Sequence, residues 1–362
     1  MGAASTPPTN FTGGDTQGLE PAPISTATRL DPIDVQEDGA DGDDDSALGS
    51  DAASSTASIS SSILQYREVQ GRTYHSEKFA TQYFAPNDEQ QSESVDITHH
   101  YLTLLLDGKL FLAPLKPDIK KVLDVGTGTG IWAIDFADEF PSAEVIGTDL
   151  SPIQPSWVPP NVKFELEDAA ETWTWPENSF DFVHMRYLFG AIADWEALFR
   201  EAFRSCKPGG YIQSCEIDPS FYSDDGTIDN DEAIQMMNKL VLEGGKRMGR
   251  SFHVVKDGLQ LKAAEAAGFV DIEQVNFKVP VGGWTKDAKL SETGQFLKST
   301  LENDLEGYTL ILWHDIMGWP KDEYQVCLMN MRKALNNKRY HAYLNLRYVY
   351  ARKPDSENTK GE

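Results

Sequence analysis

The stretch Lys121-Val122-Leu123-Asp124-Val125-Gly126-Thr127-Gly128-Thr129-Gly130-Ile131-Trp132 decides the fold of this chain. An apolar run ends in a carboxylate, three glycines follow at alternate positions, and an amphipathic segment then begins. This order predicts a buried strand, a tight loop and the start of a helix. Glycine suits the loop because the backbone there must turn sharply or lie against a ligand without a Cβ in the way.

The glycine spacing and the acidic residue indicate which ligand this loop binds. A dinucleotide fingerprint would place its third glycine at position 131, but the chain has Ile131 there and Gly130 one residue earlier. The negative charge of Asp124 would also repel a pyrophosphate. S-adenosylmethionine fits better, because it carries sulfonium and ammonium groups and no phosphate. Glycine-rich turns also occur without a ligand, so residues downstream must decide between the two interpretations.

Composition excludes several classes of protein. A chain of 362 residues, 40% of them hydrophobic, is long enough for one large domain or two small ones. Its three cysteines are too widely spaced for a disulfide framework or a zinc pattern, which fits a reducing compartment. No apolar run reaches the ~18 residues of a membrane span. The net charge of −25 argues against direct binding to nucleic acid. We therefore expect a cytoplasmic protein with no membrane partner.

The composition changes along the chain and suggests its domain organisation. Residues 1–62 are acidic, rich in small and polar residues and nearly free of large apolar ones, which predicts a disordered tail. This tail is interpreted either as an interaction surface or as a solvated spacer. Residues 63–117 combine an aromatic-rich stretch with a helix over 88–106 and are interpreted as a lid segment. Residues 118–354 form the main domain, and residues 355–362 are expected to be disordered.

Strands and helices alternate regularly in the main domain. Strands are predicted over residues 122–125, 144–149, 162–167, 180–185, 211–216, 270–279 and 339–352, and helices over 131–140, 195–204 and 259–267. This alternation predicts an α/β fold, a Rossmann-like seven-stranded and mostly parallel sheet with helices on both faces. The two late strands are expected to pair antiparallel at one edge. A mostly helical insertion, about 284–337, precedes the last strand.

Polar residues at the carboxyl ends of the strands are site candidates, because open α/β sheets bind ligands there. Asp149 ends the second strand and is expected to accept hydrogen bonds from both ribose hydroxyls. Asp168 ends the third strand, where it can accept from an adenine amino group while the next backbone N–H donates to the ring. Each aspartate is also compatible with a purely structural role as a helix cap or turn residue. His184, Met185 and Arg186 follow the fourth strand, near the expected position of the transferred group.

The chain from about Tyr74 to Pro354 resembles the class I S-adenosylmethionine-dependent methyltransferases of the fungal LaeA-like group. The resemblance rests on residues 83–89 (YFAPNDE), 123–135 (LDVGTGTGIWAID), 145–155 (VIGTDLSPIQP), 194–195 (DW), 207–210 (KPGG) and 318–320 (GWP). It implies a methyl-transfer fold and, for some members, control of secondary metabolism through a nuclear complex with velvet-type proteins. It also implies that the glycine loop faces the methionine part of the cofactor.

The expected cofactor-binding residues can now be stated together. They are Asp124, Gly126, Thr127, Gly128, Gly130, Asp149, Leu150, Asp168, Ala169, Met185 and Tyr74. No metal site is expected, because His99 and His100 have no carboxylate at ligand spacing.

Methyl transfer needs little covalent help from the protein, because the sulfonium is already activated and orientation supplies much of the acceleration. A base is needed only if the acceptor must lose a proton, as a phenol must; a carboxylate acceptor needs none. Four histidines are candidate bases, each also compatible with a structural role: His75, His184, His253 and His314. Tyr74 is a candidate lid residue.

The apolar insertion and the fold leave two functions open. The insertion is interpreted as core packing of a cap or as an acceptor pocket closed by Phe221, Tyr222, Trp313 and His314. The first function is an enzyme that methylates a small-molecule acceptor, by O-methylation in fungal secondary metabolism. The alternative is a LaeA-like regulator in a velvet-type nuclear complex, with little or no small-molecule turnover, which would place the protein in the nucleus as well as the cytoplasm.

Overall fold

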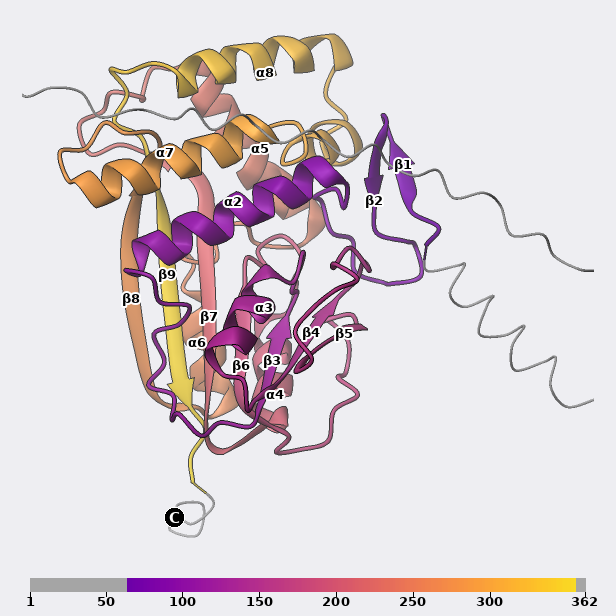
Figure 1. Cartoon of the computed structure of the whole chain (residues 1–362). Helices are drawn as coiled ribbons and strands as arrows, with labels where there is room; N and C mark the ends of the chain where they lie inside the picture. Colours follow the sequence, from indigo (N-terminus) through magenta and orange to yellow (C-terminus); the bar gives the residue numbers. More distant parts are fainter. Residues whose placement is uncertain (1–63, 356–362) are drawn as a thin grey trace, which may run out of the picture. The chain divides into compact units, whose positions relative to one another are not determined.

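A seven-stranded sheet forms the centre of the fold in a computed structural model that describes residues 64–355 (Figure 1). The predicted disorder of residues 1–62 and of the chain after residue 355 lies outside the described residues. The strands are β3 (Lys121–Val125), β4 (Glu144–Asp149), β5 (Val162–Leu166), β6 (Phe180–Arg186), β7 (Cys206–Tyr222), β8 (Val270–Pro280) and β9 (Tyr343–Arg352). Their order across the sheet is β5-β4-β3-β6-β7-β9-β8.

The strand directions confirm the predicted mixed sheet. Strands β3 to β7 pair in parallel, whereas β9 runs antiparallel to both β7 and β8. The two late strands therefore form the antiparallel pair expected at one edge. The strand order reverses at β3, which has β4 on one side and β6 on the other. In the β3–β6 pairing Asp124 lies opposite His184 and Val125 lies opposite Met185.

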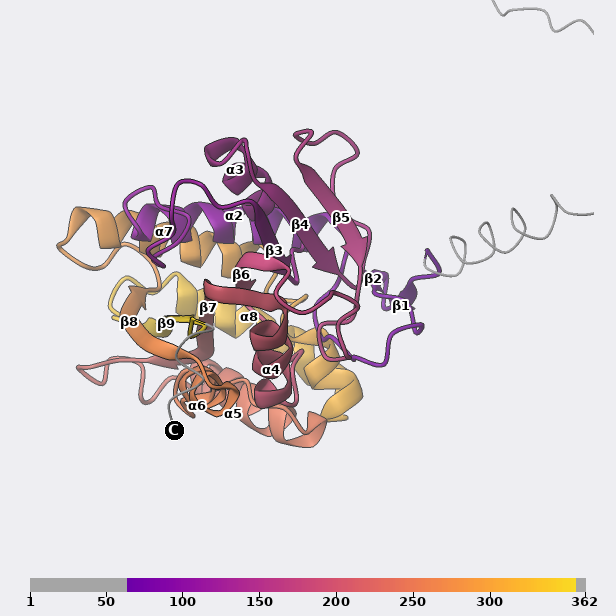
Figure 2. The ribbon, with the colours of Figure 1, turned by 90° about the horizontal axis from the view of Figure 1, so that it is seen from below.

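Helices cover both faces of the sheet, as predicted. Figure 2 shows α2 (Glu89–Leu105), α3 (Ile131–Glu139) and α7 (Ala288–Asn303) on one side, and α4 (Trp195–Ser205), α5 (Glu232–Met248) and α6 (Leu259–Ala267) on the other. Four of these helices begin with an aspartate whose side chain accepts a hydrogen bond from a first-turn N–H: Asp88, Asp194, Asp231 and Asp287. Such N-caps satisfy donors that the helix itself leaves unpaired.

The insertion between β8 and β9 is mostly helical, as predicted. It contains α7, a π-helical turn η1 (Leu312–Ile316) and α8 (Lys321–Leu335). Helix α7 packs against α2, and α5 packs against η1 and α8. Figure 1 shows α7 and α8 beyond the carboxyl ends of the parallel strands. The insertion therefore caps the edge of the sheet at which ligands are expected.

Sequence patterns missed two elements, helix α5 and a hairpin of β1 (Arg67–Val69) and β2 (Arg72–Tyr74). Helix α5 contains Gly244 and Gly245, which normally argue against a helix interior. Both glycines are buried, and a Cβ on Gly244 would lie 3.1 Å from Leu312 Cδ2. Close packing against η1 therefore explains the small residues. None of the helices between residues 64 and 355 is long and apolar enough to cross a membrane.

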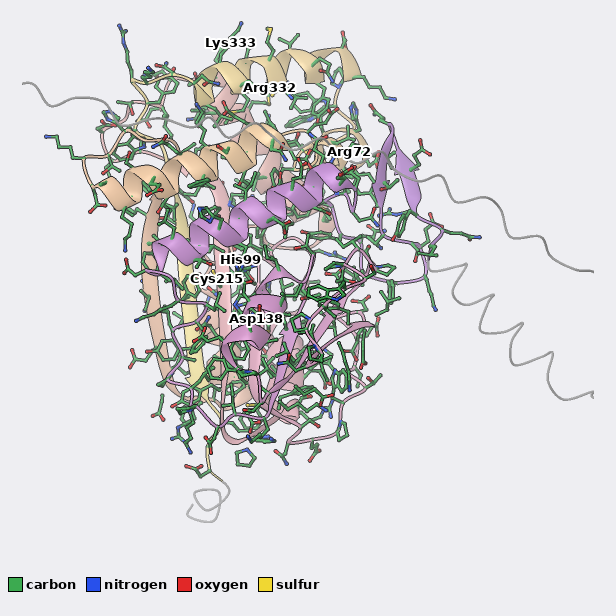
Figure 3. The ribbon with its side chains drawn as sticks, in the orientation of Figure 1. Arg72, His99, Asp138, Cys215, Arg332 and Lys333 are labelled. Atoms are coloured by element: carbon green, nitrogen blue, oxygen red, sulfur yellow. The ribbon has the colours of Figure 1, made fainter. Side chains whose placement is uncertain are left out.

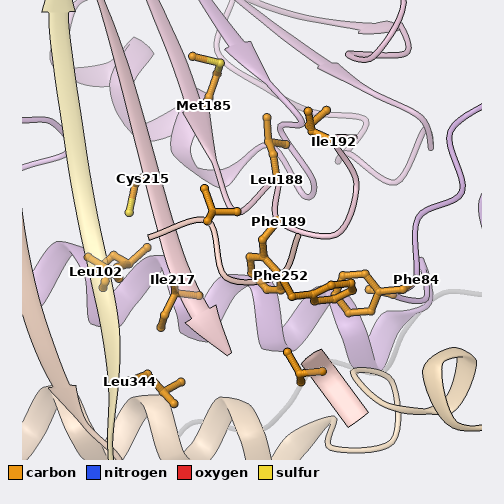
Figure 4. Packing of buried hydrophobic residues seen from close by; sticks show 14 of the residues in the cluster. Phe84, Leu102, Met185, Leu188, Phe189, Ile192, Cys215, Ile217, Phe252 and Leu344 are labelled. Atoms are coloured by element: carbon orange, nitrogen blue, oxygen red, sulfur yellow. The ribbon is translucent and has the colours of Figure 1, made fainter. Parts of the chain in front are cut away.

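An aromatic cluster joins the segment before α2 to the sheet edge (Figure 4). The rings of Phe84 and Phe252 have centroids 4.9 Å apart, and that of Phe189, which follows β6, lies 5.9 Å from Phe252. Gly190 has a φ of 70°, and a Cβ there would fall 2.5 Å from the Phe252 ring. Glycine is thus required by both backbone and packing. The cluster fixes Phe84 and Phe189 beside the cavity described next.

Candidate cofactor and acceptor site

A cavity of about 160 Å³ lies at the carboxyl ends of the strands on either side of the order reversal. Its walls come from the loops after β3, β4, β5 and β6, from residues 75–98 before and within α2, and from Tyr308 of the insertion. Open α/β sheets bind ligands at this crevice. The fold therefore brings three distant parts of the sequence to one site.

The glycine loop forms the floor of this cavity. Gly126, Thr127 and Gly128 line it, and Gly126, Gly128 and Gly130 have φ values of 68°, 58° and 80°. Such positive φ values are readily adopted only by glycine. Gly130 does not line the cavity; a Cβ there would fall 2.3 Å from the Phe164 ring. The third glycine therefore serves the packing of α3 on the sheet rather than direct contact with a ligand.

Asp124 lies behind the loop and not at the cavity wall. Its Oδ1 accepts a hydrogen bond from His184 Nδ1 at 2.7 Å, and its Oδ2 accepts one from Thr127 Oγ1 at 2.6 Å. The His184 ring stacks on Trp132 with centroids 3.7 Å apart, and burial lowers the pKa of His184 although Asp124 opposes the shift. The sequence prediction placed the charge of Asp124 against the ligand. In the structure this carboxylate instead holds the loop in shape.

Asp149 and Leu150 do line the cavity. Asp149 Oδ2 accepts from the Gly128 N–H at 2.8 Å and Oδ1 from the Ser151 N–H at 3.0 Å. Burial raises the pKa of Asp149 to about 6, although these backbone donors oppose the shift. Each carboxylate oxygen accepts two or more hydrogen bonds, so both can still accept from a ligand hydroxyl. The geometry is compatible with the predicted contact to ribose.

Two buried oxygens in the same wall have no hydrogen-bond partner within the described part of the chain. They are Asn87 Oδ1 and Gln91 Oε1, and both residues line the cavity. Asn87 also donates through Nδ2 to Ser151 Oγ at 3.1 Å, which places it beside Asp149. Buried polar atoms are normally paired, so these two acceptors fit a ligand that donates hydroxyl or ammonium hydrogens. S-adenosylmethionine carries both kinds of donor.

Asp168 and Ala169 line the cavity on the β5 side. The carboxylate of Asp168 accepts from Thr81 Oγ1 at 2.7 Å and from the Thr81 N–H at 3.1 Å. It also accepts from the Ala170 N–H at 3.0 Å. Asp168 therefore fixes the segment before α2 against the sheet edge, a role that the sequence did not predict. Its expected contact with adenine remains a prediction.

None of the four candidate histidines offers a free ring nitrogen to the cavity in the described structure. Only His75 is at the wall, and its Nδ1 donates to the Ser76 carbonyl at 3.0 Å while Nε2 accepts from the Tyr83 N–H at 3.1 Å. His184, His253 and His314 lie elsewhere.

Two predicted cofactor contacts also fall outside the cavity. Tyr74 and Met185 are fully buried in the apolar core and do not line the wall. Their positions in the sequence indicated only proximity to the sheet edge, whereas their side-chain directions depend on packing against other elements.

The turn after β6 contributes residues that the sequence did not single out. Tyr187 has a φ of 57°, lines the cavity, and its hydroxyl pairs with that of Tyr101 on α2. Fully buried Glu216 holds this turn by accepting from the N–H groups of Leu188 and Phe189, each at 3.0 Å. Burial raises the pKa of Glu216 to about 8. The signal was present, because these residues also follow a strand end.

The far wall of the cavity is largely apolar and aromatic. It is formed by Tyr83, Phe84, Leu188, Phe189, Ile192 and Tyr308. The predicted pocket closed by Phe221, Tyr222, Trp313 and His314 is wrong, because none of these lines the cavity. Trp313 is buried in the insertion, where its indole N–H donates to the Pro320 carbonyl at 3.0 Å. The alternative interpretation of this aromatic density, core packing, is the one the structure supports.

Comparison with known proteins places the chain among methyltransferases. The sequence model of a family described as "Methyltransferase domain" matches residues 97–274. The chain is 37% identical over 305 residues to the methyltransferase pytC of Aspergillus terreus, covering 84% of this chain and 93% of that protein. It is 33% identical to the secondary metabolism regulator LAE1 of Cochliobolus heterostrophus, over 78% of this chain and 94% of that protein. It is 30% identical to the protein-methionine methyltransferase laeA of Emericella nidulans, covering 84% and 81%.

The fold, the glycine loop and the cavity define a Rossmann-like methyltransferase that uses S-adenosylmethionine. The chain belongs to the class I S-adenosylmethionine-dependent methyltransferases of the fungal LaeA-like group.

Proposed function

We propose that the protein methylates an oxygen of a small molecule with a largely apolar body in fungal secondary metabolism. One observation carries the proposal: a single cavity joins the glycine loop to a wall of aromatic and aliphatic side chains. Pockets of this kind suit small ligands with large apolar surfaces. The similarity to pytC, named as a methyltransferase, supports an enzyme.

The surroundings of the cavity favour an acceptor that is already anionic. The cofactor supplies an activated methyl group, so the protein must hold the acceptor in line and exclude water. His75 has both ring nitrogens occupied, and burial raises the pKa of Tyr83 and Tyr308. In the apolar half of the cavity, the described residues therefore include no group suited to remove a proton. A carboxylate or an acidic enol, which needs no base, is the acceptor class we propose.

A labelling experiment tests this function. Purified protein is incubated with methyl-labelled S-adenosylmethionine and the acidic fraction of a fungal metabolite extract, and labelled small molecules are separated by chromatography. We expect a labelled methyl ester or enol ether. Phe189→Ala should lower its yield by enlarging the acceptor wall, with S-adenosylhomocysteine affinity unchanged. Trp157→Ala is the matched control, because Trp157 is 86% exposed and lies outside the cavity wall. Label found on protein alone would contradict the proposal.

A second candidate is a regulatory methyltransferase in a velvet-type nuclear complex. The observation that favours it is similarity to LAE1 and laeA, which are named as secondary metabolism regulators or as a protein-methionine methyltransferase. Its acceptor would be a protein side chain rather than a metabolite. Retention of a velvet-type protein on the immobilised chain, together with methyl label confined to protein, would favour this function over the first.

A further inference from the structure

Arg186 is a cation in the cavity wall without an anionic partner in the described structure. It is the last residue of β6 and the only lysine or arginine among the described residues that line the cavity. Within residues 64–355 no carboxylate lies within ion-pair distance of it, and its one hydrogen bond joins Nη1 to His99 Nδ1 at 3.3 Å. A half-buried charge is usually paired. The guanidinium is therefore available to an anionic ligand.

His99 and Asp135 fix the direction of this guanidinium. An arginine only donates hydrogen bonds, so Nδ1 of His99 must accept and the ring hydrogen must lie on Nε2. That hydrogen is donated to Asp135 Oδ2 at 2.9 Å. The three residues come from β6, α2 and α3, and Figure 3 shows His99 on the side of α2 that faces the sheet. Among the described residues only one guanidinium nitrogen has a hydrogen-bond partner, which leaves further N–H groups for a ligand.

The position of Arg186 along the sheet edge indicates the kind of anion. Met185 pairs with Val125, so Arg186 lies beside Gly126 at the start of the glycine loop. Asp149, at the end of β4, lies two strands away, which is roughly 10 Å at a spacing of ~4.8 Å per strand. If the nucleoside of a ligand is held at Asp149 and its aliphatic part passes over the end of β3, the far end of the ligand lies at β6. In S-adenosylmethionine that end carries an amino-acid carboxylate.

We infer that Arg186, oriented by His99 and Asp135, binds a carboxylate at the β6 end of the cavity. A guanidinium suits this ligand, because its planar fork can donate two parallel hydrogen bonds to both oxygens. The position fits the carboxylate of the cofactor's methionine part. A carboxylate acceptor of the proposed function offers the same chemistry from a second source, and the experiment separates the two.

Calorimetric titration of the full chain tests the cofactor as the source. S-adenosylhomocysteine has the amino-acid end, whereas 5′-methylthioadenosine lacks it. In Arg186→Met we expect affinity for S-adenosylhomocysteine to fall about ten- to a hundred-fold, with affinity for methylthioadenosine unchanged. Arg186→Lys should recover part of the loss. Arg200→Met is the matched control, because Arg200 is an exposed residue of α4 outside the cavity wall.

A second titration tests the acceptor as the source. If Arg186→Met keeps its affinity for S-adenosylhomocysteine, benzoate and the uncharged benzamide are titrated into the complexes of wild type and variant. Benzoate binding that requires Arg186 would assign the site to an acceptor carboxylate. The inference is overturned if neither S-adenosylhomocysteine affinity nor benzoate affinity depends on Arg186. It is also overturned if the variant's affinity for methylthioadenosine falls as much as its affinity for S-adenosylhomocysteine. The first titration needs no acceptor, so its result is independent of the proposed function.

Discussion

Asp124, Asp149 and Asp168 lie at or near the carboxyl ends of three adjacent strands, yet their surroundings give them different roles. Asp124 lies behind the glycine loop and accepts hydrogen bonds from His184 and Thr127. Asp168 holds Thr81 and still borders the cavity. Of the three, Asp149 receives only backbone donors in the described structure. Its free lone pairs make it the carboxylate best placed to accept from a ligand.

Protonation of Asp149 should weaken cofactor binding below pH 6. Burial raises the pKa of this carboxyl to about 6, and ligand hydroxyls donate more strongly to the charged form. Protons therefore compete with the ligand, and we expect S-adenosylhomocysteine affinity to fall up to about tenfold from pH 6 to pH 5. Calorimetry across pH 5–8 measures the profile.

The Asp149→Asn variant should bind more weakly and lose this pH dependence. Asp138→Asn, an exposed change on α3, should keep the wild-type profile. A profile that is the same in wild type and Asp149→Asn would assign the titration to another group.

The role of a residue was predictable where it depends on backbone conformation, and not where it depends on side chains that are distant in the sequence. The alternate glycines indicated a loop of unusual backbone, and all three have positive φ. The role of Asp124 depends on His184, which lies sixty residues away in the sequence and opposite it in the sheet. Nothing local distinguishes a carboxylate that faces a ligand from one that faces a histidine.

At the scale of elements, the segment before α2 completes the cavity. The match to the methyltransferase family begins at residue 97, whereas His75, Thr81, Tyr83 and Asn87 already line the wall. Thr81 donates a hydrogen bond to Asp168, and Asn87 donates one to Ser151. The segment therefore forms part of the cavity wall, and the lid role expected for residues 63–117 stays a prediction.

Arg72 joins this segment to the insertion, and its loss should destabilise both. The guanidinium donates to Asp304 Oδ1 at 2.7 Å and Oδ2 at 2.8 Å, and it also pairs with Asp88, the N-cap of α2. Figure 3 shows Arg72 near one end of α2. The side chain of Asp304 has no exposed surface. Arg72→Met leaves this charge buried without a counter-ion and should cost about 3–5 kcal/mol of unfolding free energy.

Urea denaturation measures this change. Arg200→Met serves as the comparison, since its ion pairs at 3.7 Å are largely exposed and worth at most about 1 kcal/mol. Equal effects of the two substitutions would show that the buried pair does not tie the segments together.

Helices and strands were predictable where apolar residues recur at a regular spacing along the sequence. The alternation of strands and helices from residue 121 to residue 216 gave the parallel half of the sheet. Strand β7 begins at Cys206, although Lys207-Pro208-Gly209-Gly210 suggested a turn before it. Sequence context could not reveal that pairing to β9 extends this strand to Tyr222.

At the scale of the whole molecule, one site is assembled from three regions of sequence. Residues before α2, the strand ends, and Tyr308 of the insertion meet around the cavity. The sequence predicted the strand ends as the ligand site, because open α/β sheets bind ligands there. It could not show which distant segments cover these strand ends. That information lies in long-range contacts such as the pairing of Arg72 with Asp304.

Removal of residues 1–62 separates the two proposed functions. The described cavity is lined by residues between His75 and Tyr308, and Arg72 and Asp304 anchor its cover. We therefore expect the truncated protein to bind S-adenosylhomocysteine with the affinity of the full chain, as measured by calorimetry. A small-molecule enzyme should also keep its turnover, because substrate and cofactor meet within this cavity.

A regulator that uses the acidic tail as a contact surface should instead lose its effect. Restoration of metabolite production in a strain lacking the gene measures that effect for the full and the truncated chain. Full restoration by the truncated chain would argue against the regulatory function. Intact cofactor binding without restoration would favour it, since the defect would then lie in contacts outside the methyl-transfer site.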